Sequence, residues 1–364
     1  MNIAEIGYGQ IQPKVASSPT DSRVFLIGDL NDYSCDVCVD VNDPLQSIDD
    51  MFEKIPEDIN SNSEIYINSM IGIKENFLGP PEFIQKYVDF FCLLFNKLLI
   101  SNKKVNFLQI GTPDSPIIPL FEGIAFSCEY EYSNLHAKTL KITHKLFPSS
   151  AQLNQIWLLK YKSFLITHDN VYIKKCIPFK ESNNFVQNRL KHAGVYVITG
   201  GNGGIGFLIS KWLVENYQAR VILIGRRELN EEQKKEVKNV GVSAYISTDV
   251  SDYEELEKSI GYIRNYYGHI DGIFHLAGII KDKLLRNYES RDVNLVISPK
   301  IYGALNLFKI SQKIDLGFVC LFSSISGIIG NIGQAVYSAA NAFMDNFCSY
   351  LRNEQDYKNR FSIN

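Results

Sequence analysis

The sequence lacks the features that direct a protein across or into a membrane. Its first residues, Met1–Ile6, show no basic segment followed by an apolar run, so no signal peptide is expected. The most apolar stretch, Val88–Ile100, contains Asp89, Asn96 and Lys97 and is too short to cross a bilayer. We expect a helix that faces the protein core at this place.

Cysteine is sparse and shows no pattern of pairs. The seven cysteines are scattered and odd in number, which argues against a disulfide framework and is typical of reduced thiols in the cytoplasm. Cys35 and Cys38 have CxxC spacing, but no second pair or histidine cluster follows at the spacing of metal ligands. The alternating pattern around them predicts a strand, and no metal site is expected.

A strong charge of either sign is missing as well. The formal net charge is −3, and the aromatic residues are not interleaved with basic runs. A surface that binds nucleic acid or an anionic membrane is therefore not expected.

The chain does have enough material for two globular domains, because 45% of its 364 residues are hydrophobic and 21% are charged. The polar segment Lys180–Asn184 separates two halves, which predicts one domain over residues 1–185 and a second over residues 186–364. Both halves alternate short apolar runs with helical ones. The predicted fold class is α/β, with two tandem Rossmann-like parallel-sheet subdomains.

The first half has no glycine fingerprint and no cluster of acid–base residues, which favours a structural role. Its predicted strands are Val24–Ile27, Ile65–Ile67, Val105–Ile110, Thr139–Ile142 and Ser163–Ile166, and its predicted helices are Phe83–Leu99 and Pro119–Tyr130.

The second half has the pattern of a doubly wound parallel sheet, which binds ligands at the carboxyl ends of its strands. Its predicted strands are Val195–Thr199, Val221–Ile224, Ser243–Ser247, Gly272–His275 and Leu316–Ser323, with a helix from Phe207 to about Tyr217.

A glycine-rich segment, Gly201-x-Gly203-x-x-Gly206, lies between the first of these strands and the helix. The spacing alone is weak, and a plain glycine turn is the alternative. Its position supports a dinucleotide site, because glycines let the backbone approach a pyrophosphate at a helix N-terminus. The predicted cofactor contacts are Thr199, Gly201, Asn202, Gly203, Ile205, Gly206, Asp249, Val250, Ala277 and Gly278.

Two arginines follow the second strand of this half, where proteins that bind NAD carry an acidic residue. Arg226 and Arg227 instead offer guanidinium groups, which suit the 2′-phosphate of NADPH. Two solvated surface arginines are the alternative. The sequence predicts NADPH as the cofactor.

Several segments of the second half together carry a family resemblance. They are Thr199–Gly206, Phe274–Gly278, Phe322–Gly327 and Tyr337–Asn341. With them, residues 185–364 resemble the short-chain dehydrogenase/reductases and, among these, the ketoreductase domains of modular type I polyketide synthases. Around Gly123–Tyr130 the first half is similar to the structural, cofactor-free subdomain that precedes such catalytic domains.

The resemblance implies a catalytic set of Tyr337, Ser324, Lys300 and Asn341. In ordinary short-chain dehydrogenases a lysine follows the tyrosine by four residues, whereas here Asn341 has that place and Lys300 lies upstream. Polyketide ketoreductases show this exchange. His275 matches a motif position that shapes the loop, so a structural role is expected for it.

The implied reaction is the NADPH-dependent reduction of a β-ketoacyl thioester on an acyl carrier protein to the β-hydroxyacyl thioester. A phenol, with an ordinary pKa of about 10, is a poor proton donor at neutral pH. Lys300 and the oxidised nicotinamide would add positive charge that helps Tyr337 to protonate the forming alkoxide. Ser324 would orient the carbonyl, and Asn341 would position Lys300 or a water. The implied partners are this carrier protein and neighbouring synthase domains.

The segment Ile279–Asp282 resembles the Leu-Asp-Asp motif of ketoreductases that give D-hydroxy products. Lys281 replaces the first aspartate, while Asp282 keeps the second, and Ser326–Gln334 has no tryptophan. We expect Asp282 to orient the substrate and the product to have the D configuration.

The sequence ends at Phe361–Asn364, which corresponds to the middle or end of the sixth core strand. Ketoreductases continue into a loop that contacts the nicotinamide, a lid helix and a seventh strand. We expect that the catalytic subdomain is cut short and that residues 1–364 alone are unstable or inactive. A split synthase and a sequence broken at both ends both remain open.

Two other functions fit the sequence less well. One is a stand-alone short-chain dehydrogenase that acts on a free metabolite. The other is a catalytically silent scaffold that packs against synthase domains.

Overall fold

The computed structural model describes residues 4–11, 23–29, 37–39, 46, 48–49, 64–69, 77, 83–100, 104–143, 148–167, 170–178, 190–353 and 361–363. The chain forms two compact units. The first comprises Met1–Asn184, Asp282–Tyr288 and Ile328–Ala339, and the second comprises Phe185–Lys281, Glu289–Gly327 and Ala340–Asn364. Two short segments of the second half of the sequence therefore pack with the first unit.

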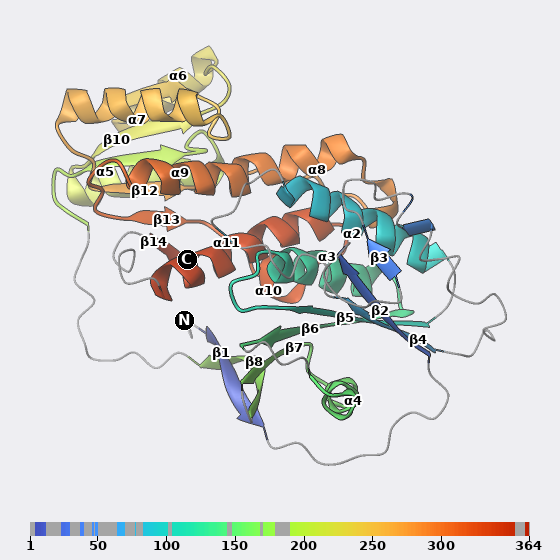
Figure 1. The fold of residues 1–364 in the computed structure, drawn as a ribbon. Coiled ribbons are helices and arrows are strands. Elements are labelled where there is room, and N and C mark those ends of the chain that lie inside the picture. The colour runs from blue at the N-terminus through green and yellow to red at the C-terminus, as the bar shows by residue number, and fades with distance from the viewer. Residues whose placement is uncertain are drawn as a thin grey trace. The chain divides into compact units, whose positions relative to one another are not determined.

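The first unit contains an eight-stranded sheet (Figure 1). Its strands are β1 (Ala4–Ile11), β2 (Arg23–Asp29), β3 (Val37–Val39), β4 (Glu64–Ser69), β5 (Lys104–Gly111), β6 (Leu135–Ile142), β7 (Ser163–Thr167) and β8 (Asn170–Pro178). Their order is β1-β8-β7-β6-β5-β4-β2-β3. The pairs from β3 to β7 are parallel, whereas β8 is antiparallel to both β7 and β1.

Three helices accompany this sheet: α2 (Phe83–Ile100), α3 (Ile117–Glu131) and α4 (Ser150–Leu158). The predicted strands and helices of the first half are confirmed, with small shifts at their ends. The predicted set omits β1, β8 and α4. Only for α4 is a local signal evident, because Ser149 and Gln152 form a capping box at its start. Cys35 lies outside the described residues, and Cys38 lies in β3.

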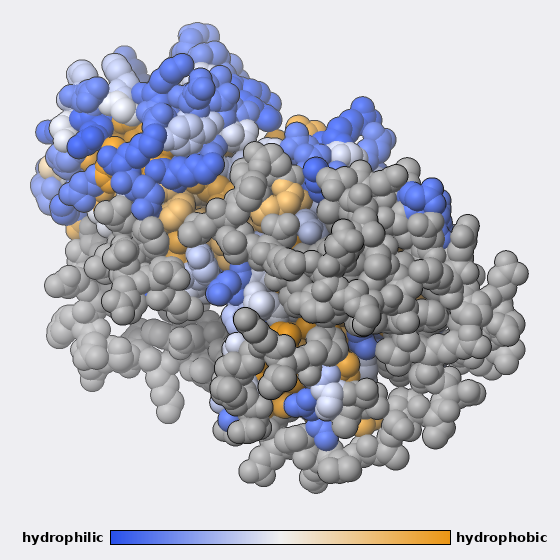
Figure 2. All heavy atoms as spheres, in the orientation of Figure 1, coloured by the Kyte–Doolittle hydropathy of each residue, from blue (hydrophilic) through white to orange (hydrophobic). Residues whose placement is uncertain are grey.

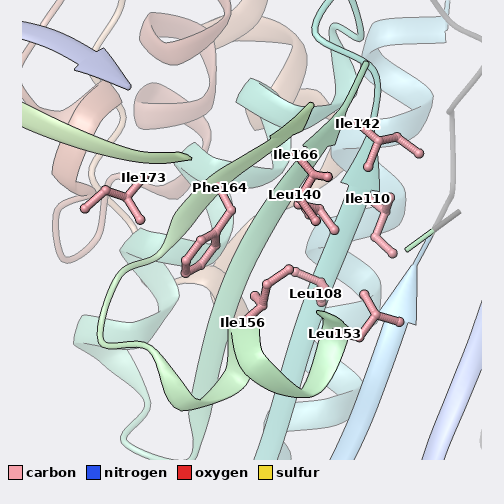
Figure 3. Close-up of a cluster of buried hydrophobic side chains, with 9 residues drawn as sticks. All are labelled: Leu108, Ile110, Leu140, Ile142, Leu153, Ile156, Phe164, Ile166 and Ile173. Carbon is pink, nitrogen blue, oxygen red and sulfur yellow. The ribbon is translucent and has the colours of Figure 1, made fainter. Parts of the chain in front are cut away.

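Side chains of opposite faces of the first sheet enter different cores. Phe107 of β5 contacts Phe95 of α2 and Phe121 of α3, with ring centroids 5.5 and 5.2 Å apart. Phe121 also contacts Phe91 and Phe95 of α2, at 5.3 and 5.6 Å. On the other face a second cluster lies between the sheet and α4 (Figure 3). Its buried members are Leu108, Ile110, Leu140, Ile142, Leu153, Ile156, Phe164, Ile166 and Ile173. The two-residue period of a strand explains this division.

The second unit contains a six-stranded sheet of order β11-β10-β9-β12-β13-β14, and all its strand pairs are parallel. The strands are β9 (Val195–Thr199), β10 (Arg220–Gly225), β11 (Ala244–Ser247), β12 (Gly272–His275), β13 (Val319–Leu321) and β14 (Phe361–Ile363). The strand order reverses between β9 and β12, which makes this the switch point where such sheets bind ligands.

The helical elements of the second half include α5 (Gly204–Tyr217), α6 (Glu231–Val240), α7 (Tyr253–Tyr267), α8 (Ser290–Ile297), α9 (Gly303–Ser311) and α11 (Ala335–Asn353). The predicted strand at Leu316–Ser323 is too long, because Leu316 makes only an isolated bridge to Ile270 and β13 ends at Leu321. The helix α5 begins before the predicted Phe207, since the glycine-rich segment forms its first turn.

The core of the second unit lies against β9, β10, β12 and β13. One cluster contains Tyr196, Ile198, Leu213, Val221 and Phe318. In contrast, α6 has no buried residue, and Figure 2 shows hydrophilic side chains gathered over α6 and α7.

Among the described residues, no helix is both long and apolar enough to span a bilayer. The apolar stretch Val88–Ile100, predicted as a helix that faces the core, forms most of α2. Its fully buried residues include Val88, Phe91, Leu94, Phe95 and Leu98.

Candidate nucleotide and catalytic site

The turn between β9 and α5 leaves an open helix N-terminus. Gly200 has a φ of 68°, a left-handed conformation that favours glycine, and its N–H donates to the carbonyl of Ile224 at 2.8 Å. A Cβ on Gly206 would lie 2.7 Å from the Cα of Gly201, so a side chain there would force the turn apart. Gly203 and Gly204 are exposed where α5 begins. The first N–H groups of α5 thus face accessible space.

A pocket lies at the carboxyl ends of β9, β10, β11 and β12, next to this turn. Its lining residues are Gly200, Asn202, Ile224, Gly225, Arg226, Arg227, Thr248, Asp249, Val250, Ala277, Gly278, Ile279 and Pro299.

With Arg226 and Arg227 included, seven of the twelve predicted cofactor contacts line this pocket. Of the others, Thr199, Gly201, Gly203, Ile205 and Gly206 end β9 or shape the turn. The sequence reasoning misses Gly200, Ile224, Gly225, Thr248, Ile279 and Pro299. Each of them lies within two residues of a predicted site residue. The ends of the predicted strands could therefore have indicated these residues as well.

The two arginines lie at the end of β10, with exposed side chains. Their backbone is held by β11, because the hydroxyl of Ser247 donates to the carbonyl of Arg226 at 3.3 Å and that of Tyr245 donates to the carbonyl of Arg227. The loop is therefore fixed while both guanidinium groups stay available at the pocket.

The loop after β11 is also fixed by hydrogen bonds. Asp249 Oδ1 accepts from the N–H and the hydroxyl of Ser251, at 2.9 and 2.6 Å. The amide of Asn306 in α9 donates to the carbonyls of Val250 and Ser251, at 3.1 and 2.9 Å. Asn306 thus supports the pocket wall, a role that its sequence position gives no reason to expect.

Lys300 lies in a π-helical turn, Ser298–Tyr302, and is 5% exposed. Its Nζ donates to the carbonyl of Phe322 at 3.1 Å. Burial lowers the pKa of Lys300 to about 8, although Asp345 favours the charged form. A Cβ on Gly278 would lie 2.9 Å from the Cε of Lys300, so the glycine leaves room for this side chain beside the pocket.

His275, at the end of β12, is buried behind this lysine. Its Nδ1 lies 2.7 Å from the hydroxyl of Thr199, and its Nε2 lies 3.4 Å from the carbonyl of Lys300. Burial and the charge of Lys300 lower the pKa of His275 to about 4, so the imidazole is neutral at neutral pH. These contacts fit the structural role expected for it.

Two further members of the predicted catalytic set lie in the second unit with Lys300. The hydroxyl of Ser324, in the loop after β13, accepts hydrogen bonds from the N–H and the hydroxyl of Ser326 at 3.3 and 3.1 Å. Asn341 is buried in α11, and its carbonyl accepts from the hydroxyl of Ser323 at 3.4 Å. The loop that carries Ser324 is therefore tied to α11.

Tyr337 and Asp282 lie in segments of the first unit. Tyr337 is half-buried in the first turn of α11, four residues before Asn341, which places the two on one helix face. Asp282 is exposed, and its Oδ1 accepts from the amide of Gln334 at 3.0 Å. No group of metal-binding side chains occurs among the described residues.

A family model described as KR domain matches residues 194–364. Residues 194–364 belong to the KR, or ketoreductase, domain family. The polyketide synthase PksN of Bacillus subtilis (strain 168) is 38% identical over 194 residues, which cover 52% of this chain and 4% of that protein. The chain thus spans only a small part of this curated relative.

Solved ketoreductase structures share the fold over nearly the whole chain. An N-terminal ketoreductase from the macrolactin assembly line has a TM-score of 0.79 and 21% identity, and covers 98% of this chain and 81% of its own. A ketoreductase domain from the bacillaene assembly line has a TM-score of 0.72 and 23% identity, and covers 99% of this chain and 82% of its own. The structural likeness therefore includes the first half.

KR domains use a nicotinamide dinucleotide, and this chain's residues fit one. The exposed N-terminus of α5 suits a pyrophosphate, and the fixed arginine loop at the pocket suits a further anionic group. The lack of a side chain at Gly203 and Gly204 leaves the space that such a group requires.

Proposed function

We propose that this chain is the ketoreductase of a polyketide or fatty-acid-like synthase. It reduces the β-ketoacyl thioester carried by an acyl carrier protein to the β-hydroxyacyl thioester, with NADPH as the cofactor. Its subdomains are a structural one over residues 1–185 and a catalytic one over residues 186–364. The acyl carrier protein and the neighbouring synthase domains are its partners.

The buried lysine beside the pocket carries this proposal. Lys300 is buried next to the open pocket, and its lowered pKa of about 8 still leaves it mostly charged at neutral pH. A cation in a water-poor site stabilises the negative charge that develops on a carbonyl oxygen during reduction.

Each polar side chain of the catalytic set has one task. The phenol of Tyr337 gives its proton to the carbonyl oxygen, and the ammonium of Lys300 stabilises the phenolate that remains. The hydroxyl of Ser324 donates a hydrogen bond to the same oxygen and orients it. Asn341 positions Lys300 or a relaying water. The bound cofactor supplies the hydride.

The specificity for NADPH rests on Arg226 and Arg227, whose exposed guanidinium groups lie at the pocket and suit a 2′-phosphate. Asp282 orients the acyl chain, which favours the D-hydroxy product. Chiral analysis that finds mainly the L product would refute this part.

Substitution of the tyrosine tests the reaction. We expect Tyr337→Phe to lower kcat for a β-ketoacyl pantetheine thioester by about a thousandfold, within the range for general acid catalysis, with NADPH affinity unchanged. Tyr350→Phe is the matched control, because Tyr350 lies on the same helix and has no task in the reaction. Equal activity of Tyr337→Phe and Tyr350→Phe would reject the proposed mechanism.

The same assay separates the alternatives. Faster turnover of free ketones than of the thioester would indicate a stand-alone dehydrogenase, and the absence of binding of both NADPH and NADH would indicate a scaffold. The assay uses the full protein as the cell makes it.

A further inference from the structure

The helix α3 ends in a carboxylate that binds two distant segments of the chain. Glu131 Oε2 accepts the N–H of Leu285 at 2.9 Å, and its Oε1 accepts the N–H of Gly333 at 3.0 Å. Leu285 lies in the segment Asp282–Tyr288, and Gly333 lies in the segment Ile328–Ala339. One side chain of the first half thus holds both segments that the second half contributes to this unit.

Further hydrogen bonds join the two segments to α3 and to each other. The hydroxyl of Ser127, one turn before Glu131, accepts the N–H of Asn331 at 3.1 Å. Between the segments, the N–H of Lys283 donates to the carbonyl of Gly333 at 2.9 Å, and Gln334 donates to Asp282 at 3.0 Å.

The backbone of α3 and the backbone of the segment Ile328–Ala339 also approach so closely that no side chain fits between them. A Cβ on Gly123 of α3 would lie 2.1 Å from the backbone nitrogen of Ala339 in α11. Gly330 has a φ of 76°, and a Cβ on it would lie 2.5 Å from the carbonyl carbon of Phe126. The first turn of α11 is therefore set directly on α3.

The position of Glu131 is unfavourable for helix stability alone. It is the last residue of α3, where the helix dipole disfavours negative charge, and no basic residue lies in the last turn. The two N–H donors from the other segments compensate for this. The carboxylate therefore fits a role outside its own helix.

We propose that Glu131 is a positioning residue of the ketoreductase. Its two oxygens fix the segment that carries Asp282 relative to the segment that leads into Tyr337. This inference rests on the proposed function, because those two residues are its substrate-orienting and proton-donating groups.

The chain offers a matched control two residues away. Glu129 also accepts a backbone N–H, that of Ala137 at 2.6 Å, and pairs with Lys162. Both of its partners belong to the first half and lie outside the two segments. Glu129→Gln removes a comparable carboxylate without a change at either segment.

Kinetics of the full protein test the proposal. In Glu131→Gln one N–H faces the amide NH₂, a donor against a donor, so one segment loses its acceptor. We expect kcat to fall by about 10- to 100-fold, since a misplacement of about 1 Å can cost about a hundredfold, with NADPH affinity unchanged. We also expect a less pure product configuration. Glu129→Gln should keep kcat within about twofold and the product configuration of the wild type.

Amide hydrogen exchange supplies a readout that needs no reaction. One of the N–H groups of Leu285 and Gly333 should lose protection in Glu131→Gln, and both should keep it in Glu129→Gln. If Glu131→Gln fails to fold, Ser127→Ala replaces it, with loss of protection at Asn331 and a kcat about threefold lower.

The outcomes separate this proposal from the proposed function. Unchanged protection in Glu131→Gln, or equal losses of kcat in Glu131→Gln and Glu129→Gln, would overturn the positioning role. A wild-type protein without reductase activity would reject the function, while the exchange measurement would still decide whether Glu131 restrains the two segments.

Discussion

The space beside the turn from a strand to a helix is filled after β5 of the first sheet and open after β9 of the second. After β5, the space beside Gly111 is filled, because a Cβ there would lie 2.9 Å from Ile118 Cγ1 and 3.3 Å from Ser115 Cβ. After β9, a Cβ on Gly204 would meet nothing within 4 Å. An α/β architecture alone therefore does not make a nucleotide site. The helix N-terminus must also be left uncovered.

Two buried charges, those of Glu122 and Lys300, are stabilised to different extents. Glu122 of α3 accepts hydrogen bonds from Thr139 at 2.7 Å, Ser163 at 2.8 Å and Lys174 at 2.8 Å. Burial alone raises the pKa of Glu122, but Lys174 and Lys141 more than offset this and lower it to about 2. Lys300 donates to a neutral carbonyl, and burial lowers its pKa to about 8 although Asp345 favours the charged form. Several partners thus stabilise the charge of Glu122, while burial outweighs the nearby carboxylate at Lys300, as it also does at Lys138 of the first unit.

The largest expected effect concerns Glu122. We expect Glu122→Gln to destabilise the first unit by about 4 kcal/mol, because it leaves buried lysines without their counter-charge. NADPH affinity should not change. Hydrogen exchange of the buried amides of β5 and β6, measured in the full protein at increasing urea, reports the free energy of unfolding of the first unit. A loss below about 1 kcal/mol would contradict the structural role.

The same carboxylate should make the stability of the first unit fall at acidic pH. The folded pKa of Glu122, about 2, lies below its ordinary value of 4.5. The contribution of Glu122 to the free energy of unfolding is therefore complete above about pH 4.5 and is lost as the pH falls toward 2. The loss of stability on acidification should be smaller in Glu122→Gln, and an equal loss in both proteins would argue against this assignment.

A pair of glycine substitutions contrasts the two turns. Gly206→Val should weaken NADPH binding by about a hundredfold, because its Cβ would meet backbone that cannot move aside. Gly111→Ala should leave NADPH affinity unchanged, since its Cβ meets mainly the flexible side chain of Ile118. Fluorescence titration measures both. Similar NADPH affinities of the two variants would contradict the claim that only the turn after β9 belongs to the nucleotide site.

Much of the fold follows from periodicity, but the joining of the halves does not. The apolar runs of β9 and β12 predict their bounds correctly, because buried parallel strands are continuous in hydrophobicity. The pocket residues follow from strand ends and the glycine spacing. The contacts of Glu131 with Leu285 and Gly333 are invisible in the sequence, since backbone N–H groups carry no residue signature. Asn306 and the filled turn after β5 depend in the same way on tertiary packing.

The arginines give a smaller effect, limited to cofactor choice. We expect the double variant Arg226→Ala and Arg227→Ala to lower the preference for NADPH over NADH by about thirtyfold, since charged hydrogen bonds contribute about 2 kcal/mol. NADH affinity should stay within about twofold of the wild type. An equal loss for both cofactors would mean that the arginines support the loop and do not read the 2′-phosphate.

The pH dependence distinguishes reactivity from stability at Lys300. We expect kcat to fall by about tenfold per pH unit above about 8, as the ammonium loses its proton. Because the folded pKa lies below the ordinary value of 10.5, the contribution of Lys300 to stability rises with pH over the same window. A flat kcat profile, or unfolding that parallels the loss of kcat, would contradict this role.

Transfer of an isotope tests the central claim most directly. The full protein is incubated with NADPH that carries deuterium at both positions of nicotinamide C4 and with a β-ketoacyl thioester on its acyl carrier protein, and the product is examined by mass spectrometry after a fixed time. The account predicts one deuterium at the carbinol carbon in the wild type and almost none in Tyr337→Phe. A wild-type product without deuterium, or equal transfer by both proteins, would contradict it.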